Sequence, residues 1–458
     1  MRITNLNPAH DVGASAWGVE FEGHRMLLDA GVHPKREGKE GLPLYGKLAG
    51  EELDAIVISH CHHDHVGSLP VAVRNHPRAH VLMTELSYFI VDRVLHNSVN
   101  VMTRQRDELG IAEYPLFTHG EVDEIESVFQ GFRYNREVEW AGFGKVRSGG
   151  RSPTLEFLDA GHALGAAGVM VRGEQETLFY TGDVSFRDQT LLKGARFEDV
   201  QADVLIMETT RGARATPEGF SRESEIEKLA AAIREVQERN GSVLIPAFAL
   251  GRTQEILALL ALLMRAGRLP RQPIYIGGLG RVFTEIYDLQ AHRAHRNHSN
   301  LSLTESLDLQ VLERRQMETI KLSGGRIFVL TSGMMTPNTA AYEIALRMIE
   351  DERQGIFFVG YADPATPAGI LRAAVDGGTF AMGPQDRKVT RRCDVREFDL
   401  TSHANREELL EFVGEVSPRV VVLGHGEADA REWFREQIGL RHPRVKVLDP
   451  GPGEVVEA

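Results

Sequence analysis

Several features that define particular protein classes are missing from this chain of 458 residues. Only two cysteines are present, Cys61 and Cys393, which excludes a disulfide framework and leads us to expect a reducing, cytoplasmic location. No stretch approaches the roughly 20 consecutive apolar residues of a membrane helix, and the N-terminus lacks the basic start and apolar run of a secretion signal. Internal repeats, low-complexity tracts and long linkers are also absent. We therefore expect folded domains and no membrane partner.

An excess of positive charge is missing as well. The formal net charge is −13, whereas proteins that bind nucleic acids usually carry a basic face. The overall charge therefore counts against a nucleic-acid partner, although a local basic groove or bound metal cations could still accept phosphates. The chain is too long for one ordinary domain, and its length suits two or three.

Short apolar runs rich in β-branched residues alternate along the chain with amphipathic stretches. The spacing of Ile226, Leu229, Ile233 and Val236 predicts a helix that ends at Asn240-Gly241. Further helices are predicted over residues 405–413 and 427–438, and buried strands over residues 55–59, 204–207, 243–245, 327–330, 356–359 and 420–423. The pattern indicates an α/β chain. The part before residue 209 is richer in strands and turns, and residues 209–397 show repeated β-α units that are typical of a separate open sheet.

The most informative string comes directly after the predicted strand that ends at Ser59. It places four potential metal ligands, His60, His62, Asp64 and His65, within six residues. Imidazole and carboxylate together suit zinc and related metals, and so dense a set can serve two ions. Loops held by a rigid strand are also where catalytic groups concentrate. The alternative is a surface loop that is merely rich in histidine, but the pattern H-x-H-x-D-H after a buried strand favours metal binding.

Further candidate ligands stand at three other predicted strand ends. His162 follows the apolar run 155–158, Asp183 follows the run 177–180, and His425 follows the run 420–423. Gly182 would let the backbone turn sharply just before Asp183. A lone histidine after a strand is usually structural or exposed to solvent. Because three such ends occur in a chain that already carries the first motif, we expect these residues to complete the ligand set.

Together these motifs resemble the β-CASP branch of the metallo-β-lactamase superfamily, which includes RNA 3′-end-processing endonuclease subunits, RNase J and Artemis-like DNA nucleases. The similarity runs over nearly the whole chain. The motifs of the superfamily are matched by residues 28–31 (LDAG), residues 60–65 (HCHHDH), His162 and Asp183. Motifs A, B and C of the branch are matched by residues 205–208 (LIME), 400–403 (LTSH) and 423–426 (LGHG). Its domain signatures are matched by residues 246–255 (PAFALGRTQE), 332–334 (SGM) and 359–361 (VGY).

The resemblance implies two zinc ions per chain and a fold that surrounds them. The first ion would be held by His60, His62 and His162 and the second by Asp64, His65 and His425, with Asp183 as the bridge. Asp29 would hold the metal loops without touching an ion. The implied fold is a four-layer αβ/βα sandwich formed by residues 1–208 and 398–458. An α/β β-CASP domain, residues 209–397, would be inserted as a cap over the site.

The same resemblance implies hydrolysis of single-stranded RNA, by endonuclease or 5′ exonuclease action, to 5′-phosphate and 3′-hydroxyl ends. Two zinc ions would bring the pKa of a shared water to roughly 7 and neutralise charge on the phosphate. His403 would donate a proton to the departing 3′ oxygen, while Glu208 would orient it and favour its protonated form. Asp64 and Asp183 would take part in catalysis as ligands. Without the resemblance, Glu208 could equally cap a turn, and His403 could be a neighbour of a helix N-cap.

Three segments depart from the family pattern, and none of them contains a metal ligand. Motif A continues as residues 209–212 (TTRG) where a tyrosine before the glycine is usual. Residues 277–280 (GGLG) stand where Asp-Ser-Pro is common, and residues 366–368 (TPA) stand where a Thr-Leu-Gly string is usual. By the resemblance, these segments line the domain boundary and the substrate groove. They therefore put the choice of substrate in question, but not the metal site.

Three residues are candidates for contacts with substrate phosphate: Arg211, Arg252 and Ser332. Arg252 follows a glycine at an expected helix start, where backbone N–H groups also favour anions, but surface arginines are usually only solvated. Cys61, between two ligands, is interpreted as a packing residue. Three further histidines, His292, His295 and His298, recur at every third position. They could form a second metal site, but a solvated helix or loop is the favoured interpretation.

Four functions remain open at this point: an RNA nuclease, an Artemis-like DNA nuclease, a metallo-hydrolase acting on a different ester or a lactam, and a scaffold without activity. Motif C is typically valine in the DNA nucleases, so His425 favours RNA. The complete A, B and C set argues against other substrates, and the filled ligand positions argue against a scaffold. The stretches before Asp29 and after His425 are too short for the additional domains of related nucleases. We therefore expect partners or a homodimer to supply what those domains do.

Overall fold

A computed structural model describes residues 1–139, 153–382 and 387–458, and these residues form two compact units. The first unit consists of Met1–Arg187, Gly194–Thr216 and His403–Ala458, and the second of Asp188–Lys193 and Pro217–Ser402. Both ends of the chain therefore belong to the first unit. The domain limits predicted from the sequence, between residues 208 and 209 and between residues 397 and 398, were drawn from sequence motifs. They describe a different division from these packing units and stay a prediction.

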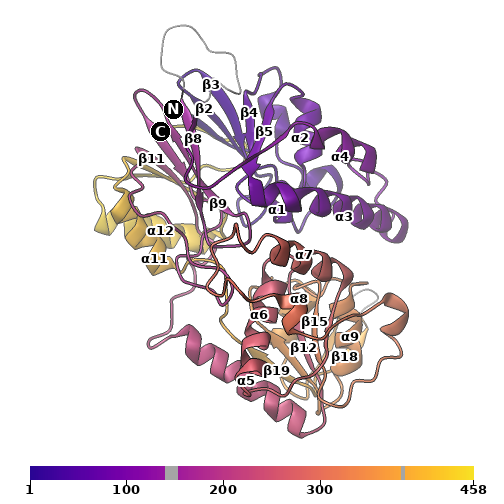
Figure 1. The fold of residues 1–458 in the computed structure, drawn as a ribbon. Coiled ribbons are helices and arrows are strands. Elements are labelled where there is room, and N and C mark those ends of the chain that lie inside the picture. Colours follow the sequence, from indigo (N-terminus) through magenta and orange to yellow (C-terminus); the bar gives the residue numbers. More distant parts are fainter. Residues whose placement is uncertain (140–152, 383–386) are drawn as a thin grey trace. The chain divides into compact units, whose positions relative to one another are not determined.

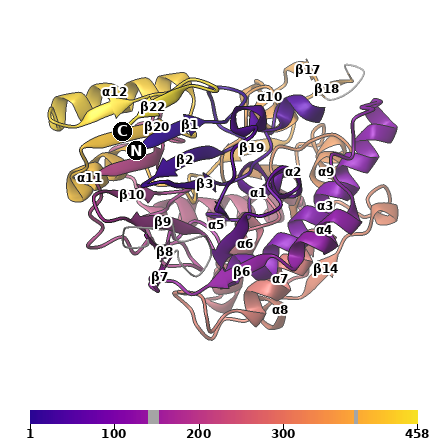
Figure 2. The ribbon, with the colours of Figure 1, turned by 90° about the horizontal axis from the view of Figure 1, so that it is seen from above.

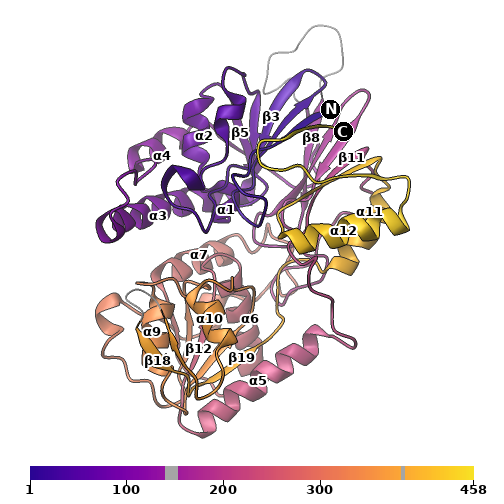
Figure 3. The same ribbon diagram turned by 180° about the vertical axis from the view of Figure 1, so that it is seen from behind.

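The first unit contains two seven-stranded sheets (Figure 1). In spatial order, the first sheet consists of β22 (Val455–Glu457), β1 (Arg2–Asn5), β2 (Trp17–Phe21), β3 (His24–Leu28), β4 (Ala55–Val57), β5 (His80–Thr84) and β6 (Phe129–Phe132). The second consists of β21 (Lys446–Leu448), β20 (Val420–Gly424), β11 (Val204–Glu208), β10 (Thr177–Tyr180), β9 (Ala167–Arg172), β8 (Thr154–Asp159) and β7 (Val138–Glu139). Because β1 pairs with β22, the two termini lie side by side (Figure 3).

Helices cover the outer faces of both sheets, so the first unit has four layers (Figure 2). The helices beside the first sheet are α1 (His63–Val66), α2 (Leu69–Asn75), α3 (Glu85–Leu109) and α4 (His119–Glu126), and those beside the second are α11 (Arg406–Val416) and α12 (Ala428–Arg441). One apolar core, with Trp17, Phe21 and Phe157, lies between the sheets. Another, with Phe412 and Phe434, joins the second sheet to α11 and α12. The predicted αβ/βα sandwich is confirmed.

The second unit contains a six-stranded parallel sheet (Figure 3). In spatial order its strands are β14 (Leu309–Val311), β13 (Ile274–Ile276), β15 (Ile327–Leu330), β12 (Val243–Pro246), β16 (Gly355–Phe358) and β19 (Asp394–Glu397), and β17 (Thr379–Ala381) and β18 (Lys388–Thr390) form a separate hairpin. Its helices are α5 (Arg222–Glu238), α6 (Arg252–Arg265), α7 (Gly278–Leu289), α8 (Leu303–Ser306), α9 (Ala340–Met348) and α10 (Pro367–Ala373). The predicted open sheet with repeated β-α units is confirmed.

The predicted strands and helices form because local signals and burial agree. All six predicted apolar runs are strands, and every residue of those strands is buried. Helix α5 buries Leu229, Ile233 and Val236 on one face and begins at the N-cap Ser221. Helix α11 begins at Asn405, whose side chain accepts a hydrogen bond from the Glu408 N–H. Within the described ranges, none of the helices combines the length and apolar character that crossing a bilayer requires.

Candidate metal centre

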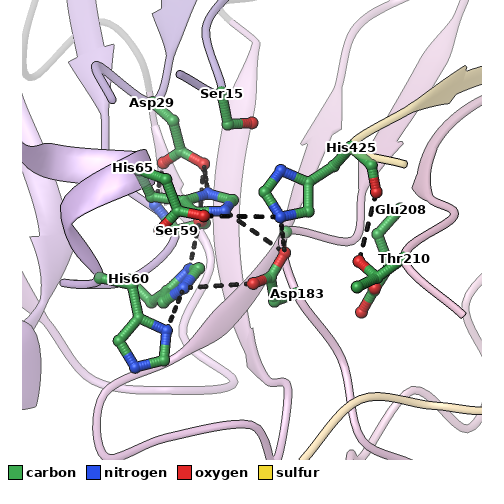
Figure 4. Close-up of polar contacts among 12 residues, drawn as sticks. Ser15, Asp29, Ser59, His60, His65, Asp183, Glu208, Thr210 and His425 are labelled. Atoms are coloured by element: carbon green, nitrogen blue, oxygen red, sulfur yellow. Dashed lines mark hydrogen bonds and ion pairs between the residues drawn. The ribbon is translucent and has the colours of Figure 1, made fainter. Parts of the chain in front are cut away.

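The ligand-type side chains of the first unit leave the carboxyl ends of strands that belong to both sheets. His60 and His62 follow β4, and Asp64 and His65 lie in the short helix α1 that comes next. The other candidates follow strands of the second sheet: His162 after β8, Asp183 after β10 and His425 after β20. Seven side chains from distant parts of the sequence thus converge in groups that share Asp183 or adjoin it, and Figure 4 shows four of them, His60, His65, Asp183 and His425.

The first converging group consists of His60, His62, His162 and Asp183. The Nδ1 atom of His62 lies 3.2 Å from Nε2 of His60 and 3.1 Å from Nε2 of His162. The Oδ2 atom of Asp183 lies 3.6 Å from Nε2 of both His60 and His162. Three imidazole nitrogens and one carboxylate oxygen therefore face a common centre.

The second group shares Asp183 with the first, through its other oxygen. Asp183 Oδ1 lies 3.3 Å from Nε2 of His65 and 3.5 Å from Nε2 of His425. The same His425 nitrogen lies 3.7 Å from Oδ2 of Asp64. Figure 4 shows the Asp183 carboxylate between these side chains. Its two oxygens thus face two different sets of nitrogen atoms.

The donor set and its unsatisfied atoms fit metal ions. His65 Nε2 and Asp183 Oδ1 are buried and lie 3.3 Å apart as an ion pair, without the geometry of a hydrogen bond to any other group. A buried polar atom without a partner is costly, and a cation between the two would satisfy both. Imidazole nitrogen and carboxylate oxygen are the ligands that zinc and related transition metals accept. The seven residues predicted from the sequence are the ones that converge here.

The electrostatics of the site also suit cation binding. Burial would raise the pKa of Asp183, but the charges of His425 and His65 hold that pKa well below its ordinary value. Burial would lower the pKa of His65, yet Asp183 and Asp29 hold it well above its ordinary value. The pKa of His60 lies well below the ordinary value, because burial and the charge of His65 disfavour its protonated form. A metal cation would take the place of the proton on His65.

Asp29 supports the site from behind the ligands. Its Oδ2 atom lies 2.7 Å from Nδ1 of His65, so it can accept a hydrogen bond that turns Nε2 of that ring toward Asp183. The backbone N–H of Ser59 donates to Oδ1, and the hydroxyls of Ser59 and Tyr180 donate to Oδ2. The sequence analysis predicted this supporting role for Asp29. It did not predict one for Tyr180, which was identified only as the last residue of a strand.

His403 and Glu208 form a pair beside the first group. His403 Nδ1 lies 3.0 Å from Oε2 of Glu208, and Oε1 of Glu208 accepts a hydrogen bond of 2.7 Å from the Val184 N–H. The ring of His403 packs against that of His162, with centroids 4.6 Å apart. Burial lowers the pKa of His403, but the charge and hydrogen bond of Glu208 outweigh it and raise that pKa above its ordinary value. The pair therefore has an anchored carboxylate and an imidazole that is readily protonated.

The three candidates for phosphate contact have different surroundings. Arg211 is partly exposed and lies close enough to His403 for its charge to lower the pKa of that histidine, so its predicted role stays open. Ser332 is partly exposed and its hydroxyl accepts a hydrogen bond from the Thr336 N–H, as in a turn. Arg252 is buried and donates to the Leu400 carbonyl and to Gln189 Oε1. A buried guanidinium engaged in this way braces the second unit, and a contact of Arg252 with substrate phosphate stays a prediction.

Two minor predictions can be compared with the structure. Cys61 is buried, and its Sγ points to the Ser87 carbonyl at 3.5 Å. Burial raises the pKa of this thiol to about 12, which makes it a poor ligand and agrees with a packing role. In the part of the chain that the structure describes, His292, His295 and His298 do not form a group of converging ligand atoms. A solvated stretch therefore remains the favoured interpretation of these histidines.

Comparisons with known families agree with the geometry. Residues 11–232 match the metallo-beta-lactamase superfamily, residues 253–371 match the Beta-Casp domain, and residues 388–447 match the Zn-dependent metallo-hydrolase RNA specificity domain. The candidate ligands fall in the first and third matches. The names of these domains indicate a metal cofactor at the site.

Curated relatives extend over almost the entire chain. It is 29% identical over 468 residues to ribonuclease TTHA0252 of Thermus thermophilus, covering 99% of each protein. It is 27% identical to cleavage and polyadenylation specificity factor subunit 3 of Dictyostelium discoideum and 26% identical to endoribonuclease YSH1 of Saccharomyces cerevisiae. Those matches cover 98% and 93% of this chain but only 56% and 55% of the relatives, so the chain spans about half of their length.

A solved structure shows the same fold. A protein of unknown function from Enterococcus faecalis V583 superposes with a TM-score of 0.57 at 12% identity, and the superposition covers 99% of both chains. At that identity the likeness concerns the fold alone. The matched domains, the motifs and the converging ligands together show that the chain belongs to the β-CASP branch of the metallo-β-lactamase superfamily.

Proposed function

We propose that the chain is a two-zinc ribonuclease that hydrolyses single-stranded RNA and leaves 5′-phosphate and 3′-hydroxyl ends. The observation that carries this proposal is the Asp183 carboxylate, whose two oxygens face two sets of ligand atoms beside the His403–Glu208 pair. A site of two metal ions with an adjacent proton donor is suited to displacement at phosphorus. The candidate proton donor His403, which pairs with Glu208, distinguishes this site from one that only binds metal.

RNA as the substrate is supported by relatives rather than by a visible recognition surface. The Thermus relative is named a ribonuclease, the yeast relative is named an endoribonuclease, and the third matched domain is named for RNA specificity. His425 occupies motif C, where the DNA nucleases typically have valine. These observations favour RNA over DNA, and cleavage could proceed by endonuclease or 5′ exonuclease action.

The residues of the site would have two roles, metal binding and orientation of a metal ligand. His60, His62 and His162 would hold one zinc, Asp64, His65 and His425 the other, and Asp183 would contact both. Bound zinc would lower the pKa of water toward roughly 7 and neutralise charge on the phosphate oxygens. Asp29 holds His65 in the tautomer that presents Nε2 to the site. The protein thus supplies a set of imidazoles and carboxylates in which bound cations would replace the positive charge that His65 carries without them.

The departing 3′ oxygen needs a proton, and His403 would supply it. Glu208 accepts a hydrogen bond from Nδ1, so Nε2 of the protonated ring carries the proton to be donated. Glu208 itself is fixed by the Val184 N–H, which keeps the imidazole from rotating. Because Glu208 raises the pKa of His403, a larger fraction of the ring is protonated at neutral pH than in an isolated histidine.

Removal of the bridging carboxylate should abolish both metal binding and catalysis. We expect about two zinc ions per chain in protein purified without chelators, and Asp183→Ala should lose metal and RNA cleavage together. Elemental analysis and a cleavage assay on the same preparations test this. Asp107→Ala, which changes an exposed aspartate on α3, is the matched control and should keep both. A chelated, metal-free preparation that still cleaves RNA would contradict the proposal.

Asp29→Asn should weaken metal binding without unfolding the protein. The amide keeps the shape of the side chain but loses the charge that favours the hydrogen bond from His65, so zinc affinity should fall by about 10–100-fold. Tyr180→Phe removes one hydrogen bond to the same carboxylate and should have a smaller effect. Titration with a zinc-competing chelator measures both variants, and unchanged affinity in Asp29→Asn would show that the contact is unimportant.

His403→Ala should leave the metal content unchanged and lower the rate of RNA cleavage by roughly 10²–10⁴, the usual range for general acid catalysis. The loss should shrink for a nitrophenyl phosphodiester, whose leaving group departs without a proton. Initial rates on both substrates provide the measurement. Equal losses on the two would mean that His403 has another role.

Glu208→Gln provides a companion test through pH. Because Glu208 raises the pKa of His403, its removal should let the ring lose its proton at a lower pH. A donor must be protonated to act, so the alkaline limb of the pH–rate profile should move to lower pH. A profile that moves to higher pH, or not at all, would contradict the assigned pairing.

Single-stranded RNA should be cleaved faster than DNA of the same sequence. Recognition of RNA requires groups that sense the 2′-hydroxyl, and binding should weaken steeply with salt as phosphate contacts release counterions. The comparison uses matched, end-labelled strands at one fixed salt concentration, and labels at each end also distinguish endonuclease from 5′ exonuclease action. Faster cleavage of DNA would overturn the RNA assignment and leave the metal chemistry intact.

A further inference from the structure

The loop that carries His425 is held in an unusual backbone conformation. His425 has φ of 48°, in the left-handed region that side chains other than glycine rarely adopt. The residues on either side of His425 are glycines, and neither position has room for a side chain. A Cβ atom at Gly424 would lie 2.4 Å from the Trp17 ring, and one at Gly426 would lie 2.1 Å from the Thr209 hydroxyl. Such a conformation persists only where surrounding contacts impose it.

Three consecutive carbonyls of this loop accept hydrogen bonds from other segments. The Thr209 hydroxyl donates to the Gly424 carbonyl at 2.9 Å, and the Thr209 N–H and the Thr210 hydroxyl each donate to the His425 carbonyl at 3.2 Å. Figure 4 shows the contact between Thr210 and His425. The Gly426 carbonyl accepts from Nη1 of Arg431, which lies in the first turns of α12. Arg431 is thus the charged member of the set that fixes the loop.

Arg431 also contacts Asp449 near the C-terminal end of the chain, and residues near the N-terminal end hold Asp449 and Pro450 in place. The Arg431 side chain is only 4% exposed, and its Nε atom lies 2.9 Å from Oδ1 of Asp449. His10 Nε2 lies 2.8 Å from the same Asp449 oxygen. The Asn5 side chain donates to the carbonyl of Pro450 at 2.8 Å, which ties the residue after Asp449 to the end of β1. The guanidinium thus contacts the Gly426 carbonyl and the Asp449 carboxylate, and the segment that contains Asp449 is in turn tied to His10 and Asn5.

A buried ion pair does not by itself make a protein more stable. Removing two charges from water is expensive, and apolar side chains of similar size often serve as well. The guanidinium does something that an apolar residue cannot, because it donates to the carbonyl next to a candidate metal ligand. Rigid support of this kind determines whether a ligand atom reaches its metal.

We propose that Arg431, oriented by Asp449, is a positioning residue that aims His425 at the second metal ion. The inference rests on the two-zinc function proposed above and extends it. Arg431 contacts the loop of His425, whereas His60 and His162 follow other strands, β4 and β8. Arg431 therefore controls the affinity of the Asp64, His65 and His425 site separately from that of the other site.

A pair of variants isolates the contact with the carbonyl. Arg431→Met and Arg431→Gln both lose the positive charge, but only glutamine keeps an N–H group that can donate to the Gly426 carbonyl. In the methionine variant the first ion should bind as in the wild type, and the second should bind at least about tenfold more weakly. In the glutamine variant much of that loss should be restored. Zinc-buffered dialysis with elemental analysis measures the two affinities.

Cobalt substitution adds a spectroscopic measurement that does not depend on activity. The visible absorption of bound cobalt reports the geometry of each site as the ions are added in turn. The band that belongs to the weaker ion should change in Arg431→Met and return toward the wild type in Arg431→Gln. Arg172→Met is the control, because it removes an arginine–glutamate pair of 2.7 Å between β8 and β9. It should leave both bands unchanged.

The outcomes separate positioning from simple stabilisation. Equal weakening of both ions, or failure of glutamine to restore binding, would show a general structural brace and overturn the inference. Unchanged binding of both ions in Arg431→Met would overturn it as well. If Arg431→Met does not fold, the double variant Arg431→Met/Asp449→Leu replaces it, since it leaves no unpaired buried charge. Wild-type protein that never binds a second ion would instead refute the two-zinc proposal, before any variant is compared.

Discussion

The Asp183 carboxylate is the group on which the rest of the site depends. It is buried among four imidazoles, with one oxygen facing His60 and His162 and the other facing His65 and His425. An isolated carboxylate could not remain ionised in such a place, and it does so because positive charge surrounds it. The same arrangement leaves buried atoms unsatisfied unless cations are present. The fold therefore provides a buried anion whose surroundings suit metal cations.

The sandwich architecture makes this arrangement possible. Strands of both sheets end at the same place, and each short loop that follows contributes one or a few ligands. Gly182, with φ of 53°, turns the chain sharply before Asp183, and an added Cβ atom there would lie 2.8 Å from that of Ser59. The close approach of the loops after β4 and β10 thus requires a glycine. Backbone geometry, and not only the choice of ligands, positions the metal centre.

The sequence predicted those parts of the site whose signal is local. His60, His62, Asp64 and His65 form a dense motif after an apolar run, and the remaining ligands follow recognisable strands. The supporting residues could not be found in this way, because nothing near Tyr180 in the sequence reveals its bond to Asp29, 151 positions away. Arg431 and Asp449 likewise have ordinary neighbours. The burial of Arg252 could not be foreseen for a related reason, since a helix start beside glycine gives no indication that the arginine is buried.

The division of the chain into two units places the candidate metal centre in one of them. All seven candidate ligands, together with Glu208 and His403, belong to the first unit, although they come from three separate segments of the chain. Two of the three departures from the family pattern, residues 277–280 and 366–368, belong to the second unit. These departures therefore leave every candidate metal ligand unchanged. Only Arg211, beside His403, departs from the pattern within the first unit. The charge of Arg211 lowers the pKa of His403, so an arginine at the position where the family usually has tyrosine opposes the protonation that Glu208 favours.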